Sequence, residues 1–409
     1  MPASRRDFMK GLRSGPSPQS FLSPTSSLSG AAIAARGLED YMAQAQQRGQ
    51  KTPSLVPPGV TEIRISSNEN PLGPGKVALD AILSQFPEAG RYPFNSTPGE
   101  TNLVAALAAK FDTKPDNVVL GAGSQEILKN AVRAFTSPTR ALLTASPTFE
   151  NCTNVAKQLG HAVVEVKVDS SFKLDTDAMI AASKGAGLVF FNNPNNPTAT
   201  VHGAKTVADF VERVRRISPD TVILIDEAYH DYVIDPAYQS AIPLALRAPN
   251  VFVSRTFSKA HGMAGLRVGY AIGQAETVKP LAQLKMPYNV SVFGIAAAMA
   301  SLGDPKHIED ECARNTDVRT FTMKALDEMG CKPTDSQTNF LFVEVHRTAK
   351  DFREACAKSG VTVGRDFPPF EKTYARISLG TMAEMQKATD VFRSVLRAAP
   401  SPTVAGKQR

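Results

Sequence analysis

The sequence predicts an α/β protein with a large domain, built on a mainly parallel seven-stranded sheet covered by helices, and a smaller α+β domain. Three observations predict this fold. Short apolar runs of strand length alternate with helical patterns between residues 116 and 272. These runs are apolar throughout, as in parallel strands that are buried on both faces. From about residue 305 the pattern changes to polar helices and strands of alternating polarity.

The strands of the large domain are expected at residues 118–120, 141–144, 162–166, 188–191, 221–225, 251–253 and 268–272. Helical spacing of apolar residues predicts helices over 125–135 and 206–217, between successive strands. Open sheets of this kind bind ligands beyond the carboxyl ends of their strands. The most unusual residues of the chain follow those predicted ends.

The second domain is expected to contain helices over 307–330, 349–359 and 382–398 and strands over 339–345, 361–363 and 374–379. We therefore expect a leader at residues 1–35, an arm and part of the small domain at 36–90, the large domain at 91–304, and the small domain at 305–409.

Composition excludes several classes of protein. The 409 residues are 42% hydrophobic and 21% charged, and no apolar stretch is long enough for a membrane-spanning helix. The formal net charge is +7, but basic and acidic residues are interleaved, so we expect no nucleic-acid partner. The four cysteines form no CxxC pair and the histidines lack metal-ligand spacing, so free thiols and no metal site are expected.

The first ten residues resemble a twin-arginine export signal. Residues 4–10 read Ser-Arg-Arg-Asp-Phe-Met-Lys, and Ala32, Ile33 and Ala34 offer a small-residue cleavage site. We therefore expect export to the periplasm. The alternative is a Ser/Pro-rich basic leader on a cytoplasmic protein, because the segment between contains three prolines and little apolar sequence.

Two predicted strand ends carry features that suit a flat, anionic ligand. Residues 121–126 read Gly-Ala-Gly-Ser-Gln-Glu at a strand-to-helix turn, where backbone N–H groups can approach an anion. Phe149 follows the next strand and is suited to stack on a ring, although packing is the ordinary role of such a residue. The amide-rich run 192–196 suits either a turn or a polar ligand.

Two further strand ends carry charged residues. Asp226 follows three branched apolar residues, where burial disfavours its charge unless it faces a cation such as a protonated pyridine nitrogen. Lys259 follows the strand at 251–253, and a desolvated lysine there is an amine nucleophile. The same 14-residue window holds Thr256, Ser258 and Arg267, which suit a phosphate.

Over about residues 60–395 the chain resembles the class I/II, fold-type I aminotransferases that use pyridoxal 5'-phosphate (PLP), and most of all the histidinol-phosphate aminotransferases. The motifs that carry the resemblance share their order and spacing with that family. They are residues 67–74 (SNENPLGP), 91–93 (RYP), 121–126 (GAGSQE), 195–198 (NNPT), 226–229 (DEAY), 258–259 with Arg267, and 376–381 (RISLGT).

The resemblance implies a role for each matching residue. Lys259 would carry the cofactor as a Schiff base and move a proton; Asp226 would pair with the ring nitrogen. The other residues implied to hold the cofactor are Gly123, Ser124, Gln125, Phe149, Asn196, Tyr229, Thr256, Ser258, Arg267 and, from a partner subunit of a homodimer, Tyr92. Substrate would be bound by Arg376 and Asn70. A separate hypothesis, from its position shortly before Arg376, is that Arg365 helps to select the substrate.

The implied activity is transfer of an amino group from an amino acid or amino-alcohol phosphate, histidinol-phosphate-like or aromatic, to a 2-oxo acid such as 2-oxoglutarate. Two alternatives use the same fold: a PLP-dependent decarboxylase or lyase, and a non-catalytic binding protein, which the presence of Lys259 argues against. Three departures from the family pattern, Phe94, Phe149 and Ala199, leave this chemistry intact, but the first two alter the substrate pocket.

Overall fold

The computed structural model describes residues 61–93 and 96–398. The predicted leader at residues 1–35 lies outside this part of the chain. Among the described residues, no helix is long and apolar enough to cross a membrane. All four cysteines are free, as predicted, and three of them are buried.

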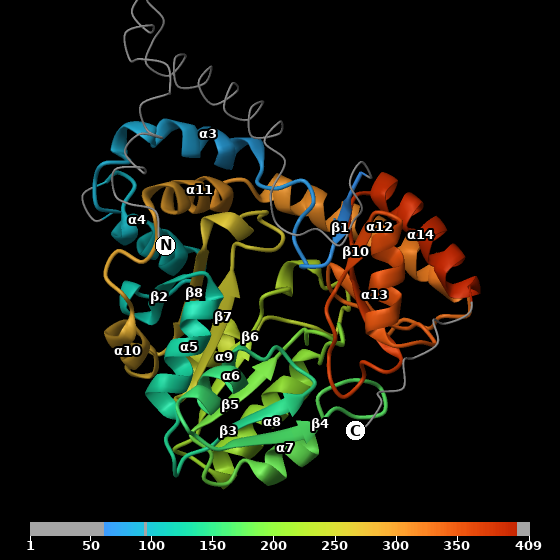
Figure 1. Ribbon diagram of the computed structural model, residues 1–409. Coiled ribbons are helices and arrows are strands. Elements are labelled where there is room, and N and C mark those ends of the chain that lie inside the picture. Colours follow the sequence, from blue (N-terminus) through green and yellow to red (C-terminus); the bar gives the residue numbers. More distant parts are fainter. Residues whose placement is uncertain (1–60, 94–95, 399–409) are drawn as a thin grey trace, which may run out of the picture. The chain divides into compact units, whose positions relative to one another are not determined.

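The large sheet has seven strands in the order β2-β8-β7-β6-β5-β3-β4 (Figure 1). Its strands are β2 (Val118–Ala122), β3 (Leu142–Ser146), β4 (Val163–Lys167), β5 (Leu188–Asn192), β6 (Val222–Asp226), β7 (Val251–Thr256) and β8 (Val268–Gly273). All seven predicted strands are present. Only β8 runs antiparallel to its neighbours β2 and β7, so the predicted mainly parallel sheet is confirmed.

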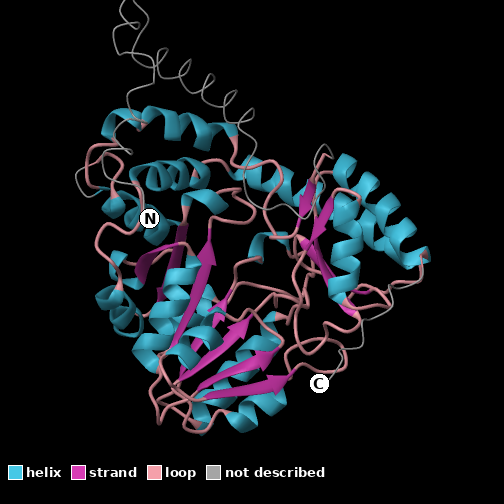
Figure 2. Cartoon of the chain, viewed as in Figure 1, coloured by secondary structure: helices cyan, strands magenta, loops and turns pink. Residues whose placement is uncertain are grey.

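Helices cover both faces of this sheet (Figure 2). Successive strand residues point to opposite faces, so Phe190 packs among α5, α6 and α10, whereas Phe191 packs among helices that include α7 and α8. The helices of this part are α3 (Lys76–Ser84), α4 (Glu100–Lys110), α5 (Ser124–Phe135), α6 (Asn151–Gln158), α7 (Thr176–Ala182), α8 (Ala204–Ile217), α9 (Ile242–Arg247), α10 (Ala275–Leu284) and α11 (Val292–Leu302). Short 3-10 turns are η2 (Phe86–Glu88), η4 (Pro115–Asn117), η5 (His230–Tyr232) and η6 (Ala264–Leu266).

A second hydrophobic core forms around the C-terminal elements. Strands β9 (Phe340–Glu344) and β11 (Tyr374–Ser378) pair antiparallel, and β1 (Ile63–Ile65) pairs parallel with β10 (Val361–Val363). Helices α12 (Pro305–Asp327), α13 (Ala349–Lys358) and α14 (Met382–Arg397) cover them. The N-terminal strand thus contributes Ile65 to the C-terminal core. We propose that the separate cores mark the large and small domains expected from the sequence.

The strand register brings the polar residues at the sheet edge together. Asn192 pairs with Asp226 and Asp226 pairs with Ser254, on the neighbouring carboxyl ends of β5, β6 and β7. At the end of β2, Gly123 adopts a φ of +72°, which favours glycine, and α5 begins at the next residue. The α5 N-terminus therefore points its N–H groups to the same edge.

Candidate active site

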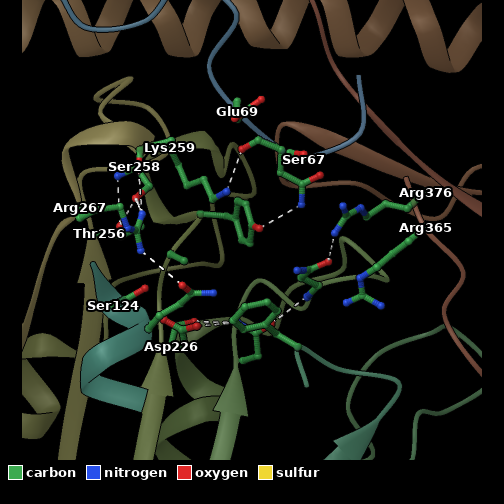
Figure 3. Close-up of a pocket in the computed structure, with 18 residues that line it drawn as sticks. Ser67, Glu69, Ser124, Asp226, Thr256, Ser258, Lys259, Arg267, Arg365 and Arg376 are labelled. Atoms are coloured by element: carbon green, nitrogen blue, oxygen red, sulfur yellow. Dashed lines mark hydrogen bonds between the residues drawn. The ribbon is translucent and has the colours of Figure 1, made fainter. Parts of the chain in front are cut away.

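A cavity of about 360 Å³ lies at the carboxyl edge of the large sheet (Figure 3). The sheet edge contributes most of its walls, and two segments associated with the second core contribute the rest. The lining residues are Ser67, Asn68, Glu69, Ser124, Gln125, Phe149, Asn192, Asn196, Asp226, Ala228, Tyr229, Thr256, Ser258, Lys259, Ala264, Arg267, Arg365 and Arg376.

One end of the cavity is suited to hold a phosphate. Arg267 reaches towards α5, with Nη2 3.4 Å from Oε1 of Gln125 and Nη1 3.4 Å from Oγ of Ser258. The hydroxyl of Thr256 donates to Oγ of Ser258 at 2.9 Å. A Cβ at Gly123 would lie 2.3 Å from Nη2 of Arg267, so glycine is required there for the guanidinium to approach the helix N-terminus. Hydroxyls, backbone N–H groups and a guanidinium together form an anion site.

The amine of Lys259 lies between the two ends of the cavity (Figure 3). Its Nζ donates a 2.9 Å hydrogen bond to the carbonyl of Asn68. Burial, followed in size by the positive charge of Arg376, lowers the pKa of Lys259 from 10.5 to about 8. The neutral, nucleophilic amine is therefore much more populated near neutral pH than that of an exposed lysine.

Asp226 is buried at the end of β6 without a cationic side chain in hydrogen-bond contact among the described residues. Its Oδ1 accepts a 2.6 Å hydrogen bond from Ser254, and its Oδ2 lies 3.4 Å from Nδ2 of Asn192. Burial raises the pKa of Asp226 to about 6. A buried carboxylate of this kind is stabilised by a cation placed in the cavity, such as a protonated ring nitrogen.

Tyr229, Asn196 and Phe149 line the same cavity as Asp226. The hydroxyl of Tyr229 accepts a 3.0 Å hydrogen bond from Nδ2 of Asn68, and burial raises the pKa of Tyr229 to about 12, so this hydroxyl stays protonated. The side-chain oxygen of Asn196 accepts from Nη1 of Arg376 at 2.9 Å. These groups are placed to contact the polar rim of a flat ring and the substrate beside it.

Arg376 and Arg365 lie at the other end of the cavity (Figure 3). Arg376 is buried, donates to the carbonyl of Ser66 at 2.7 Å, and lies 4.7 Å above the ring of Phe367. Its Nε has no hydrogen-bond partner, and no carboxylate pairs with it among the described residues. Burial lowers the pKa of Arg376 to about 10, so it remains a cation at neutral pH and lacks an anion.

Three residues predicted for the site do not line this cavity. Gly123 lies beside it and shapes the turn before α5. Asn70, expected to bind substrate, has both amide atoms occupied: Nδ2 donates to the carbonyl of Ala260 and Oδ1 accepts from the N–H of Leu72. The side chain of Asn70 therefore connects residues 70–72 to the loop that follows Lys259 (the lysine loop). Tyr92 is 65% exposed, and its ring lies 4.9 Å from the ring of Tyr288, outside the cavity.

Sequence reasoning missed six lining residues: Ser67, Asn68, Glu69, Asn192, Ala228 and Ala264. Asn68 is the most consequential, because it contacts Tyr229, Lys259 and Ser378. Its motif was recognised, but its contacts join residues up to 310 positions apart. In the amide-rich run 192–196, the side-chain amides of Asn193 and Asn195 donate to the backbone carbonyls of His202 and Pro147. Only Asn192 and Asn196 line the cavity.

These residues fit PLP. The glycine-dependent anion site suits its phosphate, the uncompensated Asp226 suits its ring nitrogen, and the easily deprotonated amine of Lys259 suits its aldehyde. Phe149, Tyr229 and Asn196 line the same cavity.

Comparison with known proteins agrees with this geometry. The family model described as aminotransferase class I and II matches residues 60–392. A histidinol-phosphate aminotransferase from Moorella thermoacetica is 32% identical over 82% of this chain and 85% of its own length. One from Anaeromyxobacter sp. is 33% identical over 83% of this chain and 93% of its own length.

Among solved structures, the histidinol-phosphate aminotransferase from Sinorhizobium meliloti in complex with PLP has a TM-score of 0.75 and 25% identity. The match covers 92% of this chain and 99% of that one. The chain therefore belongs to the class I and II aminotransferases, and it is a transaminase whose cofactor is pyridoxal phosphate.

Proposed function

We propose that the cavity transfers an amino group from an amino acid or amino-alcohol phosphate, histidinol-phosphate-like or aromatic, to a 2-oxo acid such as 2-oxoglutarate. The observation that carries this proposal is Arg376, a buried cation without a carboxylate partner among the described residues, in the same cavity as the amine of Lys259. A substrate carboxylate or phosphate supplies the missing anion and brings the neighbouring carbon towards that amine.

PLP, when bound, supplies an aldehyde carbon that condenses with amines and a ring that accepts the electron pair released at the substrate carbon. The N–H groups of Ser124 and Gln125, the hydroxyls of Thr256 and Ser258, and Arg267 would hold its phosphate. Asp226 would keep the ring nitrogen protonated. Phe149 would pack on the ring, and Asn196 and Tyr229 would bind the ring oxygen.

Lys259 is the residue that acts on the substrate. Its amine is mostly protonated at neutral pH yet loses its proton readily, because its pKa is lowered to about 8. In its neutral form this amine can take a proton from the substrate carbon and return it elsewhere. Arg376 would hold the substrate during this transfer.

The experiment is a product assay on purified, PLP-loaded protein with a panel of L-amino acids and histidinol phosphate, each with 2-oxoglutarate or a monocarboxylic 2-oxo acid. Formation of the oxo product of the donor and the amino product of the acceptor in equal amounts supports the proposal. Release of CO₂ or ammonia instead indicates the decarboxylase or lyase alternative. Absence of any turnover with a Lys259-bound cofactor indicates a binding protein.

We also propose a homodimer. Exposed apolar side chains gather along α3, η2 and the connection between α10 and α11: Leu72, Val77, Leu79, Phe86, Tyr92, Met286 and Tyr288. An apolar surface of this kind is typical of an interface between subunits. Tyr92 lies on it, which supports its expected contact with the phosphate site of a partner. Light scattering should give twice the chain mass, and a monomer would exclude the contact.

Export to the periplasm through the twin-arginine route is proposed on the motif at residues 4–10, which lies outside the described residues; a cytoplasmic protein is the alternative. Fractionation of cells that express the full chain tests this. Replacing Arg5 and Arg6 by lysine should trap the protein in the cytoplasm if the motif is used, and leave its distribution unchanged if it is not.

A further inference from the structure

The second arginine of the cavity, Arg365, is already paired. Its Nη1 lies 2.5 Å from Oε1 of Glu150, and its Nη2 donates to Oε2 of Glu150 at 2.5 Å. The two residues are 215 positions apart in the sequence. Glu150 directly precedes α6, and Arg365 lines the cavity with its guanidinium 4.2 Å above the ring of Phe367.

The two arginines therefore differ in charge balance. Arg376 is buried and has no carboxylate partner among residues 61–93 and 96–398. Arg365 is half exposed, and a two-point contact with Glu150 neutralises it. Two acids line the cavity: Asp226 lies at its cofactor end, and Glu69 pairs with Arg64 at 3.4 Å. The substrate end thus offers one uncompensated positive charge, although it contains two guanidinium groups.

We propose that Glu150 is a specificity-determining residue that makes the cavity bind substrates with one anionic group more tightly than substrates with two. This inference rests on the proposed transamination and narrows its substrate class. A donor or acceptor would place its one carboxylate or phosphate at Arg376 and an uncharged distal group near Phe149 and the paired Arg365. Dicarboxylates and phosphorylated amino acids are disfavoured, and 2-oxoglutarate is then a weaker acceptor than a monocarboxylic 2-oxo acid.

The physical reason is a combination of competition and repulsion. A second anion can reach Arg365 only by displacing the carboxylate of Glu150. That carboxylate is tethered by the chain, so it pairs with Arg365 without the loss of translational freedom that a bound substrate incurs. After displacement, the charge of Glu150 remains a few ångströms from the charge of the substrate, and like charges at that distance repel. An uncharged distal group meets neither obstacle.

The test is the substitution Glu150→Gln in the full-length, PLP-loaded protein. Glutamine keeps the size of the side chain and leaves unchanged the backbone carbonyl that accepts from Asn154 at 2.8 Å. Dissociation constants are measured by calorimetry for two unreactive analogues that lack the amino group: glutarate, with two carboxylates, and 3-phenylpropionate, with one.

We expect Glu150→Gln to tighten glutarate binding by roughly 3- to 10-fold and to leave 3-phenylpropionate unchanged. The double variant Glu150→Gln with Arg365→Gln should lose the gain, because the released guanidinium is absent. Glu165→Gln on β4 is the matched control: it removes the same charge from a surface pair with Lys157 of α6 and should change neither constant. The ratio of kcat/KM for L-glutamate over L-phenylalanine should likewise rise in Glu150→Gln and return to the wild-type value in the double variant.

An unchanged glutarate to 3-phenylpropionate ratio in Glu150→Gln overturns the inference, as does a gain that persists in the double variant. These outcomes are separable from failure of the proposed function. If transamination is observed but the ratio does not move, only the role of Glu150 is wrong. If the dissociation constants shift as expected but no donor is transaminated, the binding preference stands and the proposed reaction is wrong.

Discussion

The two ends of the cavity are built in different ways. The cofactor end comes from the carboxyl ends of parallel strands of one sheet, within residues 122–267. The substrate end combines residues 66–69, 149–150, 365 and 376, which meet only when the two cores come together. The cofactor end should therefore govern the chemistry for every substrate, whereas the substrate end should decide which substrate is bound.

The largest expected effect is at the cofactor end. Lys259→Ala should reduce kcat on the order of 10⁴-fold with every donor, because the nucleophile and proton carrier are lost together. Turnover of the purified variant and cofactor retained after dialysis are the measurements. Lys279→Ala, on the exposed face of α10, is the control and should behave as wild type. Turnover within tenfold of wild type would place the chemistry elsewhere.

Asp226→Asn should lower kcat/KM by roughly 10²-fold, because the ring nitrogen loses its charged partner. The loss in kcat/KM should be equal for two donors with unlike side chains, because the cofactor end acts on every substrate alike.

A second prediction for Asp226 concerns pH. The pKa of Asp226 is raised to about 6, so cofactor affinity of the wild type should fall below pH 6 as the carboxyl is protonated. That fall should be absent in the variant, and unequal losses between donors would contradict the comparison.

Arg376→Gln tests the substrate end. It should raise KM for carboxylate donors by about 10²-fold, since a charged hydrogen-bonded pair in a buried site is lost, and should leave cofactor retention unchanged. Steady-state kinetics with cofactor titration checks both. Arg393→Gln, in a surface pair with Asp390 on α14, is the charge-matched control. Loss of the cofactor in Arg376→Gln would mean that the two ends are not separable.

The pH dependence of Lys259 gives a smaller, graded effect. Burial lowers the pKa of this amine from 10.5 to about 8, so in cofactor-free protein its neutral fraction should rise about tenfold from pH 6 to 7 and level off above pH 8. Cyanate modification, followed by mass spectrometry of the Lys259 peptide, measures it. Lys279 in the same molecule is the reference. A Lys259 profile that still rises steeply at pH 10 would contradict the lowered pKa.

Asn70→Ser should have the smallest effect on activity. The substitution removes hydrogen bonds to the lysine loop and to Leu72, which costs about 1 to 3 kcal/mol of stability. Because Asn70 does not line the cavity, KM should change by less than about threefold. Thermal unfolding and kinetics together measure this. A KM change as large as that of Arg376→Gln would restore Asn70 to the substrate site.

The cofactor end could be predicted from sequence because its signals are local. Asp226 and Lys259 each follow an apolar run that reads as a strand, and parallel strands bring their carboxyl ends to one edge. The substrate end could be predicted only in part. Arg376 was recognised through a family motif, but nothing local indicates that Asn68 bonds Tyr229 or that Glu150 faces Arg365.

The sequence by itself determined the seven strands, the mainly parallel sheet and the residue types that follow its strand ends. These features depend on the pattern of apolar and polar residues within short stretches of the chain. Only the tertiary structure decided that Asn70 lies outside the cavity, that Ile65 belongs to the C-terminal core, and that one arginine is neutralised while the other is not. Charge balance depends on which distant side chains come within a few ångströms, and chain folding alone sets that distance.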